Sequence, residues 1–152
     1  MPNLKTLFNS EIQKEVLERI NSLSRDSKAL WGNMNVYQMV VHCIRAERHY
    51  QGQLPIAAPQ GINLADGPKW LHLLLADDTP MMRGARTNKA FVVEEAYGDL
   101  EAEILTWESL IAKYKTFRAP KYVHWFFGEM TREQLGQLAY KHNDHHLRQF
   151  GV

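Results

Sequence analysis

Cysteine is nearly absent from this sequence: Cys43 is the only one among 152 residues. An intrachain disulfide is therefore impossible, and the paired-cysteine motifs of redox centres and zinc ribbons are excluded. An excess of charge of one sign is also lacking, because 18 Lys and Arg residues offset 17 Asp and Glu residues. Without a basic block the chain has no surface suited to nucleic-acid phosphates, so no nucleic-acid partner is expected.

Long hydrophobic runs are missing as well. The apolar stretches are far too short to span a membrane, and the first residues lack the apolar core and cleavage site of a signal peptide. Together with the single thiol, these absences predict a cytoplasmic protein with no membrane partner. The composition, with 45% hydrophobic and 23% charged residues, is that of an ordinary globular chain, and the length suits one domain over residues 1–152.

Four stretches show the spacing of apolar side chains that is typical of amphipathic helices. They cover residues 7–23, 33–51, 93–114 and 131 to near the C-terminus. Thr131 and Gln134 form a capping-box pattern at the start of the last stretch. Residues 54–69 hold three prolines and two glycines and predict an irregular connection, which a short helix over residues 70–76 follows. Residues 115–128 are expected to form a loop, and no strand is predicted.

The fold class that this pattern predicts is all-α. Four helices that each have one apolar face are most simply buried against one another, as a four-helix bundle. The long irregular connection lies between the second and third long helices, so it leaves room for a crossover. Periodicity alone does not fix the order of the helices in the bundle.

Histidines cluster near the C-terminal end, and His142 and His146 are four residues apart. On a helix this spacing places both side chains on one face, about 6 Å apart along the axis, where two imidazoles can converge on one ion. Both positions extend the apolar stripe that begins at Leu135 and Leu138, so both rings are expected to face the interior. The alternative is a pair of exposed histidines, or of core histidines whose ring nitrogens have protein partners.

A catalytic zinc site usually takes three protein ligands and leaves one position open. His42 is the best third candidate, because it flanks the apolar face of the second helix beside Met39 and Ala46; the alternative is a histidine at the boundary of the core. The adjacent Cys43 faces the core stripe and is interpreted as a packing residue. The motifs of metalloproteases, di-iron bundles, haem attachment and nucleotide-binding loops are all lacking.

The sequence resembles the DinB-like (YfiT-type) superfamily of metal-binding four-helix bundles, and within it a branch of bacterial proteins. The resemblance rests on residues 4–8, 27–35 with Gln38, Met39 and His42, 124–131, and 140–152. It implies a metal bound by one histidine of the second helix and an HxxxH pair of the last helix, here His42, His142 and His146. The chain departs from the pattern at Arg148, where glycine is usual, and at Trp125, where proline is usual.

A divalent transition metal, Zn²⁺ or Ni²⁺, bound with an open coordination position favours an enzyme, either a thiol-linked transferase or a hydrolase. The resemblance points to the transferase, with a small-molecule substrate such as a low-molecular-weight thiol. His145, Asp144 and His124 are candidates for orienting the ligands or moving protons; alternatively, each is a solvated surface or helix-boundary group. The competing hypothesis is a non-catalytic metal-binding or stress-associated interaction module, and a homodimer is a candidate assembly in either case.

Overall fold

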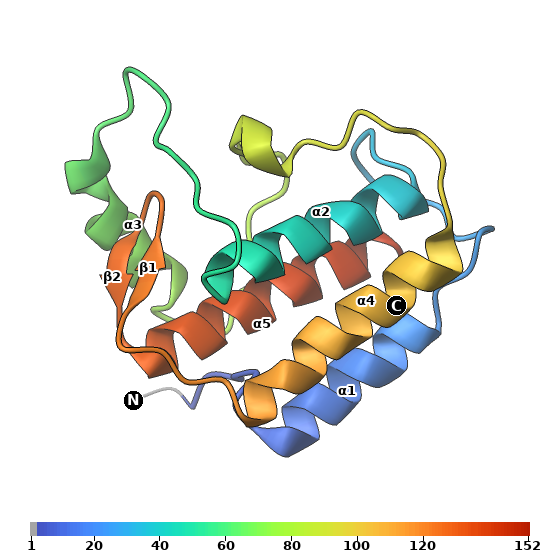
Figure 1. The fold of residues 1–152 in the computed structure, drawn as a ribbon, viewed down its shortest axis with the longest axis horizontal. Helices are drawn as coiled ribbons and strands as arrows, with labels where there is room; N and C mark the ends of the chain where they lie inside the picture. The colour runs from blue at the N-terminus through green and yellow to red at the C-terminus, as the bar shows by residue number, and fades with distance from the viewer. Residues whose placement is uncertain (1–2) are drawn as a thin grey trace.

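The computed structural model describes residues 3–152 and is mostly helical. Its four long helices are α1 (Ser10–Asn21), α2 (Val36–Tyr50), α4 (Leu100–Ala112) and α5 (Arg132–Gln149). Helix α2 packs against α4 and α5, and α1 packs against the same two helices (Figure 1). Because of this arrangement, residues far apart in the sequence, on α2 and α5, lie side by side in the interior.

The two helices that carry the candidate ligands both begin with a capping box. On α5 the Thr131 side chain accepts from the backbone N–H of Gln134, whose side chain accepts from the Thr131 N–H, as the sequence predicts. On α2 the same pair of hydrogen bonds joins Asn35 and Gln38. These caps fix where each helix starts, and therefore which side chains face the interior.

The core fills the space between the four long helices. Apolar side chains that recur at helical spacing along each of them are fully buried, among them Val16 and Ile20 of α1, Met39 and Val40 of α2, Trp107 and Ile111 of α4, and Leu135 and Leu138 of α5. Over residues 3–152, no helix has both the length and the apolar character needed to cross a membrane.

The connection between α2 and α4 is long and mostly irregular, as expected, and it covers one side of the helices (Figure 1). It contains the 3-10 helices η1 (Leu64–Asp66) and η2 (Lys89–Phe91) and the short helix α3 (Gly67–Leu74). Lys141 of α5 fastens this connection, because its Nζ donates to the carbonyl oxygens of Leu74, Asp77 and Thr79 at 2.7, 2.5 and 2.9 Å.

The predicted start of the third long helix at residue 93 is wrong, because α4 begins only at Leu100. Asp99 caps the helix by accepting from the N–H of Ala102. Just before it, Gly98 packs so closely on Tyr37 that a Cβ there would lie 2.3 Å from Cζ of the ring. Upstream of α4, Val93 is buried from a segment without regular secondary structure, whereas Ala96 and Tyr97 are exposed.

A two-stranded antiparallel sheet lies where the sequence predicted only a loop. Strands β1 (Tyr122–His124) and β2 (Gly128–Met130) pair with Tyr122 opposite Met130, and the short 3-10 helix η3 (Lys113–Lys115) precedes them. Strands of three residues are too short to show a clear period of two, which explains why the pattern missed them. Gly128, with φ of +78°, supplies the left-handed backbone at the turn.

Candidate metal centre

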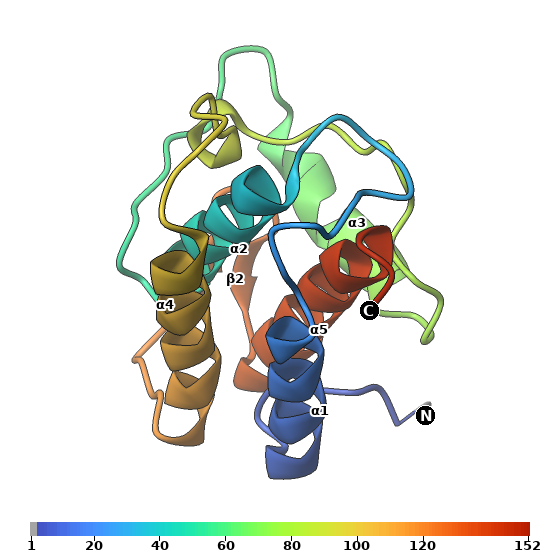
Figure 2. The ribbon, with the colours of Figure 1, turned by 90° about the vertical axis from the view of Figure 1, so that its right-hand side faces the viewer.

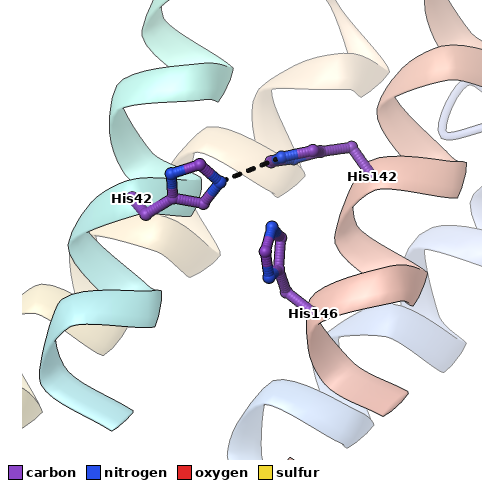
Figure 3. Close-up of side chains that lie close together, drawn as sticks. All are labelled: His42, His142 and His146. Atoms are coloured by element: carbon purple, nitrogen blue, oxygen red, sulfur yellow. Dashed lines mark hydrogen bonds between the residues drawn. The ribbon is translucent and has the colours of Figure 1, made fainter. Parts of the chain in front are cut away.

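Three imidazole rings meet between α2 and α5. His42 comes from α2, and His142 and His146 come from consecutive turns of α5; one ring nitrogen from each lies within 4.8 Å of the others (Figure 3). The ring centroids are separated by 4.6 Å for His42 and His146, 4.7 Å for His142 and His146, and 5.1 Å for His42 and His142. The structure thus brings together the three residues that the sequence singled out.

A backbone carbonyl fixes the orientation of the His42 ring. Nδ1 of His42 lies 3.0 Å from the oxygen of Phe91, in the 3-10 helix η2. Because a carbonyl oxygen only accepts, Nδ1 carries the proton and Nε2 presents its lone pair. That Nε2 atom points at the other two rings (Figure 3) and lies 3.2 Å from Nε2 of His142.

A glutamine fixes the His146 ring in the same way. Nδ1 of His146 lies 2.8 Å from Oε1 of Gln149, and Nε2 of Gln149 donates to the carbonyl of Trp31 at 2.9 Å. The second hydrogen bond identifies which end of the amide faces His146, so Nδ1 of His146 is the donor and Nε2 is free to bind a cation. Such partners on the far side of the ring are typical of metal-binding histidines.

The His142 ring shows why a cation fits the cluster. Its Nδ1 atom is buried and lacks a hydrogen-bond partner among residues 3–152. If Nε2 of His142 carries the ring proton, Nδ1 is a buried acceptor without a partner. If Nδ1 carries it, the lone pairs on Nε2 of His42 and Nε2 of His142 face each other across 3.2 Å. A cation relieves that repulsion, and two nitrogens bound to tetrahedral Zn²⁺ lie about 3.3 Å apart.

Burial keeps the three rings neutral, which is the form that binds metals. Desolvation is the main cause that lowers the pKa of each ring, well below the ordinary value for His142 and to about 3 for His146. The neighbouring imidazoles lower the pKa of His142 and of His146 further, because a positive charge on one ring disfavours a positive charge on the ring beside it. Three neutral imidazoles suit Zn²⁺, Ni²⁺ or Cu²⁺ better than Mg²⁺ or Ca²⁺.

The three polar residues proposed to assist the cluster occupy different places. The ring of His145 contacts the ring of His146, with centroids 4.9 Å apart. The carboxylate of Asp144 accepts from Arg19 and from Arg148, both at 2.8 Å. Neither residue makes a hydrogen bond to a ring of the cluster among the described contacts; the orienting partners found there are the Phe91 carbonyl and Gln149.

His124 lies in a second pair of histidines, which has a structural explanation. Its Nδ1 accepts from the backbone N–H groups of Phe126 and Phe127 at 3.1 Å, which shapes the turn of the hairpin. The neighbouring His49 donates from Nδ1 to the carbonyl of Leu54 and accepts at Nε2 from the N–H of Trp125. Both nitrogens of His49 thus have partners, as does one of His124.

Sequence reasoning missed a buried polar network beside the cluster. Glu47 and Asn143 are fully buried, and the Glu47 carboxylate accepts from Asn143, from the Tyr114 hydroxyl and from Gln51. Burial raises the pKa of Glu47 to about 7, against the opposing effect of these donors. The available signal was the position of Glu47 in the apolar stripe of α2, four residues after Cys43. Cys43 itself is buried and packs against Met39, as expected.

The fold and the cluster together define the class: a mostly helical protein with a candidate three-histidine metal centre between two helices. Within that class, the chain belongs to the family described as "Protein of unknown function (DUF1569)", whose model matches residues 8–151. Comparison with curated proteins and with solved structures gave no match.

Proposed function

We propose that this protein is a metal-dependent enzyme that binds Zn²⁺ or Ni²⁺ through His42, His142 and His146 and acts on a small molecule, as a thiol-linked transferase or a hydrolase. We also propose that its four long helices form a bundle of the DinB-like type. One observation carries the proposal: three neutral imidazoles converge to within 4.8 Å, and two of them are held with Nε2 facing inward.

The donor set supports catalysis because three protein ligands leave at least one coordination position for a substrate. A transition-metal ion bound there would lower the pKa of a water or thiol and polarise a carbonyl. The chain's own contribution is to position the rings: the Phe91 carbonyl orients His42, and Gln149 orients His146.

A second candidate function is a non-catalytic module that the metal stabilises. It is favoured by the burial of His42 and His146, which are only 5% and 7% exposed, because structural metal sites are closed to solvent. The two candidates differ in the fourth coordination position. A small thiol that enters the coordination sphere of a bound Co²⁺ ion supports the enzyme, whereas a sphere that no added ligand changes supports the module.

The metal site is tested by elemental analysis of the purified protein after reconstitution with Zn²⁺ or Ni²⁺. We expect one equivalent in the wild type and in His72→Ala, a control that alters an exposed histidine of α3, and much less in His42→Ala, His142→Ala and His146→Ala. Equal metal in all five proteins, or none in the wild type, would contradict the assignment. Activity is then sought with thiols paired with electrophiles, and with esters and amides; turnover that survives removal of the metal would exclude the mechanism.

A further inference from the structure

A cavity of about 360 Å³ lies at the C-terminal end of α5, next to the candidate metal centre. Its other lining residues come from the loop between α1 and α2 and from the connection after α3. Figure 2 shows the loop between α1 and α2 beside the C-terminal end of α5, and the N–H of Leu30 in that loop donates to the carbonyl of Gln149 at 2.7 Å. We call it the Arg83 pocket. The lining residues that matter for its chemistry are Leu30, Trp31, Met81, Arg83, His145 and Arg148.

Arg83 gives the pocket a positive charge that no acidic side chain neutralises. Its guanidinium stacks on the ring of Trp31, with Cζ 3.8 Å from the ring centroid, and it takes part in no ion pair over residues 3–152. Stacking orients the flat guanidinium and leaves its N–H groups available. A guanidinium presented in this way suits a carboxylate or phosphate oxygen, to which it can donate two parallel hydrogen bonds.

The other charged side chains at this end of α5 are paired with one another. Arg148 pairs with Asp144, the same carboxylate accepts from Arg19, and Arg19 also lies 3.7 Å from Glu15, so these four side chains carry no net charge. The main-chain oxygen of Val152, another lining residue, accepts from Arg19. Within residues 3–152, Arg83 is the guanidinium of the pocket that has no protein acceptor, and Leu30 and Trp31 supply an apolar wall beside it.

The pocket shares a wall with the candidate metal centre. The ring of Trp31 contacts the ring of His145 with centroids 5.7 Å apart, and His145 in turn contacts His146 at 4.9 Å. A second connection runs through the backbone, because the carbonyl of Trp31 accepts from Gln149, the residue that orients His146. A molecule bound against Trp31 thus lies one side chain away from a candidate metal ligand.

We infer that the Arg83 pocket binds the anionic end of the substrate, a carboxylate or phosphate ester whose apolar part lies against Trp31 and Leu30. This inference names the class of substrate for the candidate metal centre, and in that respect it rests on the proposed function. Binding of the anion itself depends on Arg83 and the pocket, and it does not require a bound metal ion.

The test compares two probes that differ only in charge, 4-phenylbutyrate and 4-phenylbutan-1-ol, titrated into the full-length protein and followed by NMR of the Trp31 indole signal. The signal is assigned with a Trp31→Phe variant. We expect the carboxylate to bind about tenfold more tightly than the alcohol, the difference that one charge-assisted hydrogen bond supplies. Arg83→Met should reduce this preference to below about twofold, while Arg86→Met, an exposed arginine of the same segment that does not line the pocket, should preserve it.

Equal affinity for the two probes, no shift of the Trp31 signal, or the same loss in Arg86→Met would overturn the inference. The titrations are repeated with metal-free protein and with His42→Ala. The preference for the carboxylate should persist in both, and its loss there would overturn the inference. A wild-type protein that prefers the carboxylate but takes up no metal after reconstitution would support the pocket and contradict the proposed metal-dependent function. Metal binding without any preference for the carboxylate would contradict the pocket alone.

Discussion

Asn143 of α5 donates from Nδ2 to Oε1 of Glu47 on α2 over 2.7 Å, in the fully buried space between the helices. The same amide accepts through its oxygen from Nε1 of Trp107 and donates a second time to the carbonyl of Ala139. Asn143 directly follows His142, so this network fixes the rotation of α5 at the turn that carries a candidate ligand. The acid–base properties of Glu47 in this network, and those of the histidine cluster, have measurable effects.

The buried carboxyl of Glu47 should make the protein less stable as the pH rises from about 4.5 to 7. The pKa of Glu47 is about 7 in the folded protein against 4.5 ordinarily, so in this window the folded state retains a proton that the unfolded state has lost. Glu47 alone should therefore lower the free energy of unfolding by about 3 kcal/mol across it. Buried histidines such as His146, whose pKa is lowered to about 3, act in the opposite direction below pH 6.5, so the Glu47 contribution is measured as a difference between two proteins. In urea denaturation between pH 4.5 and 8, the free energy of unfolding of Glu47→Gln should rise relative to that of the wild type by about this amount. A difference between the two proteins that does not change with pH would contradict the raised pKa of Glu47.

Replacing Gln149 by Leu should weaken metal binding about 10- to 100-fold, the usual cost of losing the group that orients a ligand imidazole. Without its hydrogen bond, the ring of His146 is free to rotate away from the cluster. Competition of Zn²⁺ with a chromophoric chelator measures the affinity. Gln137→Leu on the same helix, whose side chain bonds weakly to Glu133 at 3.4 Å, serves as the control. A loss of equal size in both variants would contradict the orienting role.

Zinc affinity should change little with pH above 6. The pKa of His42, His142 and His146 is lowered in each case, chiefly by burial, so protons compete with the metal less than they do at ordinary histidines. Three exposed histidines with ordinary pKa values would lose about 50-fold in affinity between pH 7.5 and 6.0, and we expect a much smaller loss here. Calorimetric titrations at the two pH values distinguish these cases, and a loss of about 50-fold would contradict the lowered pKa values.

Lys141→Met should release the connection that follows α3. The lysine is 6% exposed and donates to three backbone carbonyls, so its loss removes three hydrogen bonds from a charged donor and should cost about 2 kcal/mol of unfolding free energy. Hydrogen exchange of the amides in residues 75–82 should accelerate. In Lys14→Met, which changes an exposed lysine of α1, exchange there should match the wild type. Unaltered exchange in Lys141→Met would mean that other contacts fasten this segment.

The histidine cluster could be predicted from the sequence because two independent regularities coincide in it. A four-residue spacing places His142 and His146 on one helix face, and that face is also the apolar one. The structure places the Nε2 atoms of His42 and His142 3.2 Å apart, although the residues lie 100 positions apart in the chain. The partners that orient the rings could not be predicted, because every residue has a backbone oxygen and the sequence does not show that the one of Phe91 lies beside His42.

The starts of the helices could be predicted only in part. The capping side chain of Thr131 marks the start of α5, so that start was readable. The start of α4 was misplaced because apolar spacing continues upstream of its cap, Asp99, in a segment where Val93 is buried but Tyr97 is 89% exposed. Gly98 of that segment packs on Tyr37, a tertiary contact that a residue pattern does not show. Apolar spacing alone therefore does not specify a helix.

The separation between His42 and the pair on α5 also sets an order of events during translation. A ribosome that has made α1 to α4 has supplied one of the three donors, and the other two emerge only with residues 142 and 146. Until then α2 lacks α5, one of the two helices that it packs against, and the nascent chain has only a single imidazole of the cluster. Under the proposed function, metal binding at this cluster therefore follows synthesis of the last helix and is a late step of maturation.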